Sequence, residues 1–230
     1  MSDEKRVGVI VAICTYFRND ELATLLSKLI EFGSSRWKEI DLGVTVVDDS
    51  PDGHARAVIE HYTNGFPLGL VYENTASRNI SIARNCALEN SLTRAPWIAM
   101  TDDDCEPSEQ WLAELLRIQR LTNADVVTGL MLRRAPDHAP HWLKTQPFLQ
   151  LGEFEAEDGD ALSIAFTNNS LLSSGFLIEN PDLRFDIGLG RTGGEDVTFF
   201  RALNNRGGRI AFAKTAFVYE KLPDDRISLR

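Results

Sequence analysis

Apolar runs alternate with segments of helical periodicity in the first half of the chain, and this alternation constrains the fold more than any other feature. Residues 7–14 are apolar throughout, as expected for a strand that is buried on both faces of a sheet. Helical spacing follows in Leu22, Leu25, Leu26, Leu29 and Ile30. The pattern then predicts strands at 44–47, 68–72, 97–100 and 126–132, and helices at 55–62, 80–92 and 111–121. This order predicts an α/β fold with a Rossmann-like, mainly parallel sheet and helices on both faces.

The alternation stops after residue 132. Residues 133–160 are polar and rich in turn residues, and this predicts a long loop, a kind of segment that often binds ligands or covers a site. Beyond it we expect strands at 162–167, 170–178, 209–213 and 217–219 and a helix at 195–205. We therefore expect one domain over residues 1–230, with a larger half at 1–132 and a smaller α+β half at 133–230.

Composition excludes several classes of protein. Of the 230 residues, 43% are hydrophobic and 25% charged, which is typical of a soluble globular protein. The net charge of −10 argues against a nucleic-acid partner, because such a partner requires a basic face. Three scattered cysteines predict no disulfide framework. With no signal peptide or membrane-spanning stretch visible, we expect a cytoplasmic protein, whose membrane association, if any, is peripheral and at the inner face of the cell membrane.

Three consecutive carboxylates, Asp102, Asp103 and Asp104, directly follow the apolar run at 95–101. Such groups repel one another, so they must be solvated, hydrogen-bonded or bound to a cation. Mg²⁺ and Mn²⁺ prefer oxygen ligands, and ligands of open α/β sheets bind beyond the carboxyl ends of the strands. The triplet is therefore a candidate site for a metal ion and a phosphate. The alternative is an acidic surface turn, or a capping cluster for the helix after Pro107.

Polar residues also end the first two predicted strands, with Thr15 and Tyr16 after one and Asp48 and Asp49 after the other. In a doubly wound sheet these ends lie along one crevice with the triplet. An aspartate there can accept a hydrogen bond from uracil, a tyrosine can stack on a base, and Arg84 in the third predicted helix can pair with a phosphate. Each residue has an alternative role, in a turn or in a surface salt bridge.

A second acidic pair, Glu195 and Asp196, follows Gly193 and Gly194 at the start of a predicted helix. Carboxylates at a helix N-terminus can simply cap it, because the dipole favours negative charge there. They can also act as a general base, which must lie within hydrogen-bond reach of the proton that it removes. The sequence leaves both alternatives open.

Taken together, these segments resemble the family 2 inverting glycosyltransferases of GT-A fold, including their D-x-D motif. The resemblance rests on residues 11–16, 46–50, 79–85, 97–104 and 193–196, in the order that the family uses. Residues 190–207 and 219–223 are similar to the ExoM-like glucosyltransferases of bacterial exopolysaccharide assembly. The resemblance implies a metal-dependent hexosyltransferase of cell-surface polysaccharide synthesis. It would move a sugar from a nucleotide-diphosphate sugar, with UDP-hexose expected, to a hydroxyl of a saccharide or lipid-linked saccharide.

The resemblance also implies roles for individual residues and for the two halves. Residues 1–132 would bind the nucleotide sugar, and residues 133–230, with the loop at 133–160, would face the acceptor. Nucleotide-sugar binding would fall to Thr15, Tyr16, Asp48, Asp49, Arg84, Asp102 and Asp103. Mn²⁺ or Mg²⁺ would be held by Asp104 and Asp102, and Glu220 stands in the region where many relatives have a metal-binding histidine. Asp196 would be the catalytic base, and Glu195 would help to position the acceptor.

Three other functions are consistent with parts of the sequence. Gly193 to Asp196 is similar to the turn of diguanylate cyclases, although here it opens a helical pattern. A nucleotidyltransferase would share the sheet and the metal, but it usually has a glycine-rich loop after the first strand, and residues 15–19 contain no glycine. The third is a non-catalytic protein that binds a sugar nucleotide or carbohydrate.

Overall fold

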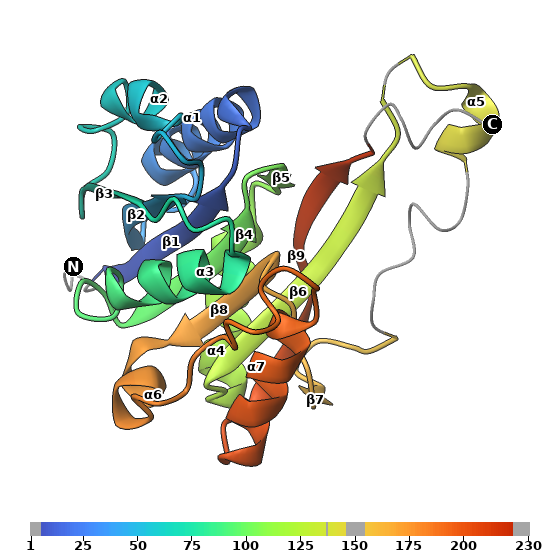
Figure 1. Ribbon diagram of the computed structural model, residues 1–230. Coiled ribbons are helices and arrows are strands. Elements are labelled where there is room, and N and C mark those ends of the chain that lie inside the picture. The colour runs from blue at the N-terminus through green and yellow to red at the C-terminus, as the bar shows by residue number, and fades with distance from the viewer. Residues whose placement is uncertain (1–5, 137, 146–154, 223–230) are drawn as a thin grey trace.

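The computed structural model describes residues 6–136, 138–145 and 155–222, and within these ranges nine strands form one sheet. Its strand order is β3-β2-β1-β4-β8-β6-β9-β5, and β7 pairs with β9 (Figure 1). The strands are β1 (Val7–Thr15), β2 (Ile40–Asp48), β3 (Leu70–Asn74), β4 (Trp97–Asp102), β5 (Cys105–Pro107), β6 (Val126–Arg134), β7 (Ala161–Leu162), β8 (Asn169–Ser173) and β9 (Ile210–Lys221). The helices are α1 (Asn19–Ser35), α2 (Arg56–Glu60), α3 (Ile80–Glu89), α4 (Trp111–Thr122), α5 (His141–Lys144), α6 (Ser174–Glu179) and α7 (Glu195–Asn205).

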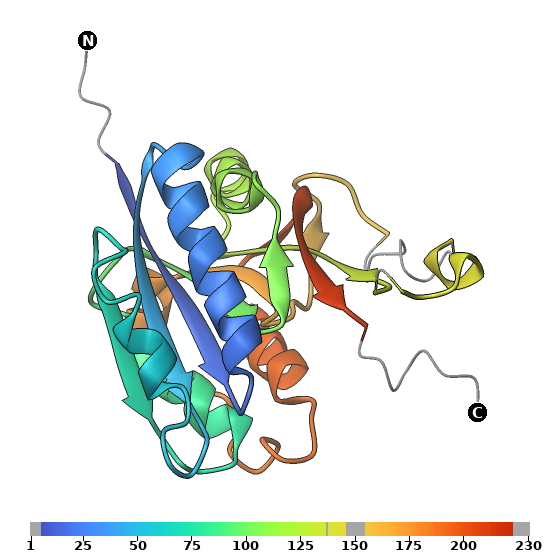
Figure 2. The ribbon, with the colours of Figure 1, turned by 90° about the horizontal axis from the view of Figure 1, so that it is seen from above.

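The first half has the predicted architecture, with β3, β2, β1 and β4 parallel and helices between them. Successive side chains of a strand point to opposite faces, so β1 contributes Val11 and Ile13 to one core and Ala12 to the other. The first core also contains side chains of α1, α2 and α4, and the second those of α3, α6 and α7. The sheet therefore carries helices on both faces, and α1 crosses the face turned to the viewer in Figure 2.

The longer ladders of the sheet are parallel, as expected, and shorter antiparallel ladders make the sheet as a whole mixed. β8 runs antiparallel to both β4 and β6, and β5 runs antiparallel to β9. The strand predicted at 170–178 is in fact β8 followed by α6, because the Ser173 hydroxyl accepts a hydrogen bond from the Phe176 N–H at 3.2 Å and caps a helix. The strand predicted at 162–167 is reduced to the two residues of β7.

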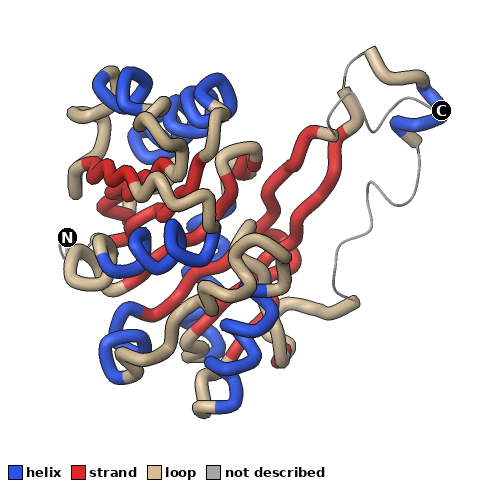
Figure 3. Tube along the Cα trace, in the orientation of Figure 1, coloured by secondary structure: helices blue, strands red, loops and turns tan. Residues whose placement is uncertain are grey.

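The two strands predicted near the C-terminal end are one continuous strand, β9, which pairs with β6 in parallel. The outer parts of β6 and β9 project from the body as a two-stranded arm (Figures 1 and 3). The predicted loop at 133–160 begins within this arm, since β6 runs to Arg134, and it contains the short helix α5. Residues 137 and 146–154 of that loop lie outside the described residues.

No helix among the described residues has the length and apolar character needed to cross a bilayer.

Asn169 at the start of β8 joins three elements through a side chain that is completely buried. Its Oδ1 accepts from the indole N–H of Trp111 at 2.8 Å, and its Nδ2 donates to the carbonyls of Leu130 at 2.8 Å and Ala216 at 2.9 Å. The pairing of β6 with β9 shifts register between Gly129 and Leu130. Asn169 therefore satisfies backbone groups that the irregular ladder leaves open.

We expect Asn169→Ala to lower the free energy of unfolding by about 3 kcal/mol, because it leaves the buried indole N–H of Trp111 and the carbonyls of Leu130 and Ala216 without this partner. Urea unfolding followed by circular dichroism would measure this loss. Asn205→Ala, at an exposed position on α7, is the matched control and should unfold like the wild type. Equal midpoints for the two variants would contradict the role given to Asn169.

Candidate active site

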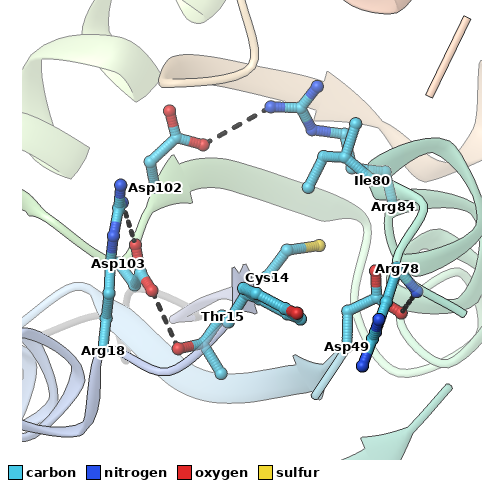
Figure 4. A pocket seen from close by; sticks show the side chains of 10 residues that line it. Cys14, Thr15, Arg18, Asp49, Arg78, Ile80, Arg84, Asp102 and Asp103 are labelled. Atoms are coloured by element: carbon cyan, nitrogen blue, oxygen red, sulfur yellow. Dashed lines mark hydrogen bonds and ion pairs between the residues drawn. The ribbon is translucent and has the colours of Figure 1, made fainter. Parts of the chain in front are cut away.

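A cavity of about 500 Å³ lies at the C-terminal ends of β1 and β4 (Figure 4). The parallel register sets Cys14 beside Asp102 and Thr15 beside Asp48, so the predicted crevice does form at this edge of the sheet. The cavity is lined by Cys14, Thr15, Tyr16, Arg18, Asp49, Arg78, Ile80, Arg84, Asp102 and Asp103. The structure thus gathers most of the residues that the sequence assigns to nucleotide-sugar binding.

Asp103, the middle residue of the triplet, is only 4% exposed. Its two oxygens accept from the Thr15 hydroxyl at 2.8 Å and from Arg18 at 2.9 Å. Burial raises the pKa of Asp103 to about 6, although the hydrogen bonds from Thr15 and Arg18 act in the opposite direction. Asp103 therefore belongs to the floor of the cavity and holds Thr15 in place.

Arg84, on α3, connects the triplet to the start of α7. Its guanidinium is 8% exposed, forms an ion pair with Glu195, and lies 3.5 Å from an oxygen of Asp102. Burial opposes the charge on Arg84, but Asp102, Glu195 and their neighbours outweigh it, and the pKa of Arg84 rises. The two acidic sequence motifs, more than 90 residues apart, therefore meet on one arginine.

Glu195 and Asp196 open α7 as predicted, at the end of a tight turn. Gly193 and Gly194 have φ values of 86° and 89°, in the left-handed region that favours glycine. Glu195 is 6% exposed, and its Oε2 has no hydrogen-bond partner among the described residues. Asp196 is half-buried, and its Oδ1 accepts from the Val197 N–H at 2.7 Å. Neither residue lines the cavity itself. The motif begins a helix, unlike the turn between strands that the cyclase alternative requires.

The segment that precedes α7 is fixed to the start of α3. The Ile80 N–H donates to the Gly190 carbonyl at 3.1 Å, and Asn79 Nδ2 donates to the Ile187 carbonyl at 2.9 Å. A side chain at Gly190 would place its Cβ 1.9 Å from Asn79 Oδ1. These contacts set the segment that leads into α7 against the start of α3, where Ile80 lines the cavity.

Asp48 and Asp49 are adjacent in sequence but differ in their surroundings. Asp48 is completely buried and does not line the cavity. Its carboxylate accepts hydrogen bonds from the backbone N–H groups of Ser50 and Ala55 and from the Tyr72 hydroxyl. Asp49 lines the cavity and accepts five hydrogen bonds from the segment 75–79. Asp48 thus organises the turn after β2, and its predicted contact with the base stays a prediction.

The sequence interpretation missed Arg18 and Arg78 as residues of the cavity. Arg18 follows Phe17, whose φ of 56° bends the chain sharply at the end of β1. Arg78 has a φ of 51° in the segment bound by Asp49. Tyr16, which was predicted, is 43% exposed at the cavity, and its ring packs edge-on against Phe17 at 4.6 Å. One feature of the sequence could have indicated Arg18 as a cavity residue: it lies just beyond a strand that ends in polar residues.

A second cavity of about 360 Å³ adjoins the first and shares Arg18 and Asp103 with it. Asp104 and Glu220 line this second cavity and not the first. Asp104 forms an ion pair with Arg18 at 2.6 Å, and Glu220 lies 3.4 Å from Arg133. The triplet therefore lies between two hollows, with Asp102 facing the first and Asp104 the second.

One group among the described residues has the geometry to hold a metal ion, and it consists of Asp102, Asp104 and Cys105. Their ligand atoms lie within 4.8 Å of one another. The carboxylates suit a hard divalent cation. The thiol does not, because burial raises the pKa of Cys105 well above its usual value and keeps it protonated. Glu220, the third predicted ligand, is not part of this group.

Comparison with known proteins identifies relatives. The family model described as glycosyl transferase family 2 matches residues 10–179. The succinoglycan biosynthesis protein ExoM of Rhizobium meliloti (strain 1021) is 34% identical over 221 residues, which are 95% of this chain and 68% of that protein.

Solved structures of S. aureus TarS share the fold. The complex with UDP superposes with a TM-score of 0.67 at 18% identity, covering 94% of this chain and 60% of the other. The complex with UDP-GlcNAc gives a TM-score of 0.66 at 17% identity, covering 95% and 59%. The chain therefore spans about 60% of these TarS chains. With the family model matching most of its length and the sheet matching these structures, the chain belongs to glycosyl transferase family 2 and is a glycosyltransferase of GT-A fold.

Proposed function

We propose that this enzyme is a metal-dependent, inverting hexosyltransferase that uses a UDP-sugar. Its acceptor is a hydroxyl of a saccharide or lipid-linked saccharide, in the synthesis of a cell-surface polysaccharide. The observation that carries the proposal is the joint contact of Arg84 with Asp102 and Glu195. This contact brings the acidic triplet close to the start of α7, which bears the candidate base Asp196. The names of the relatives support the details, since ExoM serves succinoglycan biosynthesis and TarS binds UDP and UDP-GlcNAc.

The donor nucleotide occupies the first cavity in this proposal. Tyr16 presents an exposed ring for the base, and Thr15 and Asp49 line the floor beside it. Arg78 is exposed at the cavity wall, where it can pair with a phosphate. Asp48 fixes the turn at 50–55 by accepting hydrogen bonds from its backbone, and this turn follows β2 at the end of the cavity proposed for the base. This role is in addition to the predicted contact of Asp48 with uridine.

Asp102 and Asp104 are the residues that would hold Mg²⁺ or Mn²⁺, the first at the donor cavity and the second at the adjoining one. When bound there, the cation would neutralise the charge that develops on the leaving diphosphate. Glu220 remains a proposed further ligand from the second cavity. Arg84 pairs with Asp102 and with Glu195, at the start of the helix that bears the proposed base, and its positive charge reduces the repulsion between these two carboxylates.

Asp196 is the proposed general base. Glu195 is buried and its Oε1 pairs with Arg84, so it orients the site, whereas Asp196 is half-buried and forms no ion pair with a described residue. Asp196 lies close enough to Arg84 to raise the pKa of that arginine. A base on this side would deprotonate the acceptor hydroxyl, and displacement from the face opposite the leaving diphosphate would invert the anomeric carbon.

The second half of the chain would bind the acceptor. The arm of β6 and β9 projects from the body and leads to the helix α5, which carries Trp142 (Figure 1). The Trp142 side chain is 46% exposed. An aromatic ring of this kind can stack on a sugar face. The proposed location is the cytoplasm, and a lipid-linked acceptor would bring the enzyme to the inner face of the cell membrane.

We expect Asp196→Asn to retain UDP binding and to lose transfer by roughly 10²–10⁴-fold, because the amide cannot accept the proton of the acceptor hydroxyl. Calorimetry with UDP and a turnover assay with candidate UDP-sugars would measure the two effects separately. Asp182→Asn, at an exposed position in the same half of the chain, should keep full activity. Undiminished transfer by Asp196→Asn would assign the base to another residue.

We expect Asp104→Ala to abolish the dependence of UDP binding on Mn²⁺, because one of the two hard ligands is lost. Titration calorimetry with UDP, with and without Mn²⁺, gives the affinities, and Asp182→Ala serves as the control. Wild-type stimulation by Mn²⁺ in Asp104→Ala would remove this residue from the metal site.

The Asp48→Asn variant tests two roles of Asp48 separately, namely its support of the turn after β2 and its predicted contact with the base. The amide has only one acceptor oxygen, so at least one of the buried partners of Asp48 loses its hydrogen bond, and stability should fall by about 1–3 kcal/mol. Thermal unfolding measures the loss of stability, and titration with UDP measures the contribution of the contact between Asp48 and the base. An unchanged stability with weakened UDP binding would favour the base contact alone.

A further inference from the structure

Arg18 bridges two residues of the acidic triplet with a single nitrogen atom. Its Nη1 lies 2.9 Å from Asp103 Oδ1 and 2.6 Å from Asp104 Oδ2. The side chain of Arg18 is 50% exposed, that of Asp104 is 27% exposed, and that of Asp103 is 4% exposed. One half-exposed guanidinium therefore pairs with two of the three carboxylates.

The backbone directs this arginine into the site at a cost to its own helix. Phe17 adopts a left-handed conformation with φ of 56°, which is uncommon for an aromatic residue. Arg18 then takes the N-cap position of α1, where its side chain forms no capping hydrogen bond. Serine, threonine, aspartate or asparagine usually occupies that position, because their oxygens accept from the free N–H groups. The placement of Arg18 thus serves the triplet and not the helix.

The position of Arg18 conflicts with that of a divalent cation. A cation bound by Asp102 and Asp104 would share Asp104 with a guanidinium nitrogen that already lies 2.6 Å from its oxygen. Two positive groups on one carboxylate repel each other. Arg18 is the group that can leave, since its half-exposed side chain regains water and an exposed ion pair is weak. Asp103 keeps its hydrogen bond from Thr15 when Arg18 moves.

We propose that Arg18 is an internal counter-ion that competes with the divalent cation for Asp104, so that binding of the cation requires Arg18 to move away from this carboxylate. The proposal rests on the metal site of the proposed function and adds a residue that sets its affinity. Without a cation, Arg18 stays paired with Asp103 and Asp104.

A nucleotide changes this competition. Arg18 lines both cavities, so a guanidinium released from Asp104 is still beside the proposed donor cavity, where it can pair with a phosphate oxygen. UDP would therefore stabilise the displaced position of Arg18 and raise the affinity for the cation. By linkage, the cation would raise the affinity for UDP by the same factor. Arg18 would thus contribute to the coupling between the two ligands.

The test is direct measurement of Mn²⁺ affinity by electron paramagnetic resonance of the free ion, with and without UDP. We expect Arg18→Gln to bind Mn²⁺ on the order of fivefold more tightly than the wild type without UDP, because the competing charge is gone. The gain in Mn²⁺ affinity caused by UDP should shrink in the same variant. Arg36→Gln is the control, because Arg36 lies at the other end of α1 and pairs with Glu109. It should match the wild type in both measurements.

A second variant separates charge from folding. Arg18→Lys keeps a cation at this position, so it should bind Mn²⁺ more weakly than Arg18→Gln and close to the wild type. Thermal unfolding shows whether each variant is folded. Should Arg18→Gln prove unfolded, wild-type Mn²⁺ affinity in Arg18→Lys together with tighter binding in Arg18→Met would still support the competition, and unchanged affinity in Arg18→Met would overturn it.

The outcomes distinguish this proposal from the proposed function. Mn²⁺ binding that Asp104→Ala abolishes, but that Arg18→Gln leaves unchanged or weakens, would overturn the competition and leave the metal site intact. Absence of Mn²⁺ binding in the wild type and in every Arg18 variant, with and without UDP, would overturn both. Mn²⁺ binding that is detected only in variants without the Arg18 side chain would also support the competition, because Arg18 would then prevent the ion from binding in the wild type.

Discussion

The ion pairs of Arg84 are the interaction on which the rest of the site depends. A guanidinium on α3 that is almost fully buried has to be compensated, because removing a charge from water costs several kcal/mol per ion. Asp102 at the end of β4 and Glu195 at the start of α7 provide this compensation from two parts of the chain. The arginine therefore fixes the distance between the acidic triplet and the helix that bears the proposed base.

The same principle explains how three adjacent aspartates coexist. Each carboxylate meets a different environment: Asp102 faces Arg84, Asp103 is buried against Thr15 and Arg18, and Asp104 lies at the edge with Arg18. The fold thus places three like charges in different surroundings, with one guanidinium nitrogen shared by Asp103 and Asp104. Replacing one guanidinium by another cation should therefore cost less free energy than leaving the three carboxylates with no cation at all.

The periodicity of the sequence predicts the first half of the fold well, for a physical reason. Strands buried on both faces, such as β1, are apolar at every position, and amphipathic helices such as α1 separate them clearly. The second half is harder, because the apolar residues after Asn169 fit a strand or a helix equally well. The outcome is decided by the Ser173 cap, a single hydrogen bond, and by antiparallel pairing with β4 and β6. The three residues of β5 are too few to produce any period.

Prediction of the site succeeds where residues follow strand ends and fails where charges meet across the fold. Thr15, Asp49 and Asp102 gather at the cavity because parallel strands share one edge. Asp48 and Asp49 differ in the direction of their side chains, because that of Asp48 is buried in the protein and that of Asp49 lines the cavity. Arg18 is 85 residues from Asp103, and no local pattern links them. What the charge of the triplet does require is solvation, hydrogen-bond donors or cations, and the fold supplies two guanidinium groups, Arg84 from α3 and Arg18 from the start of α1.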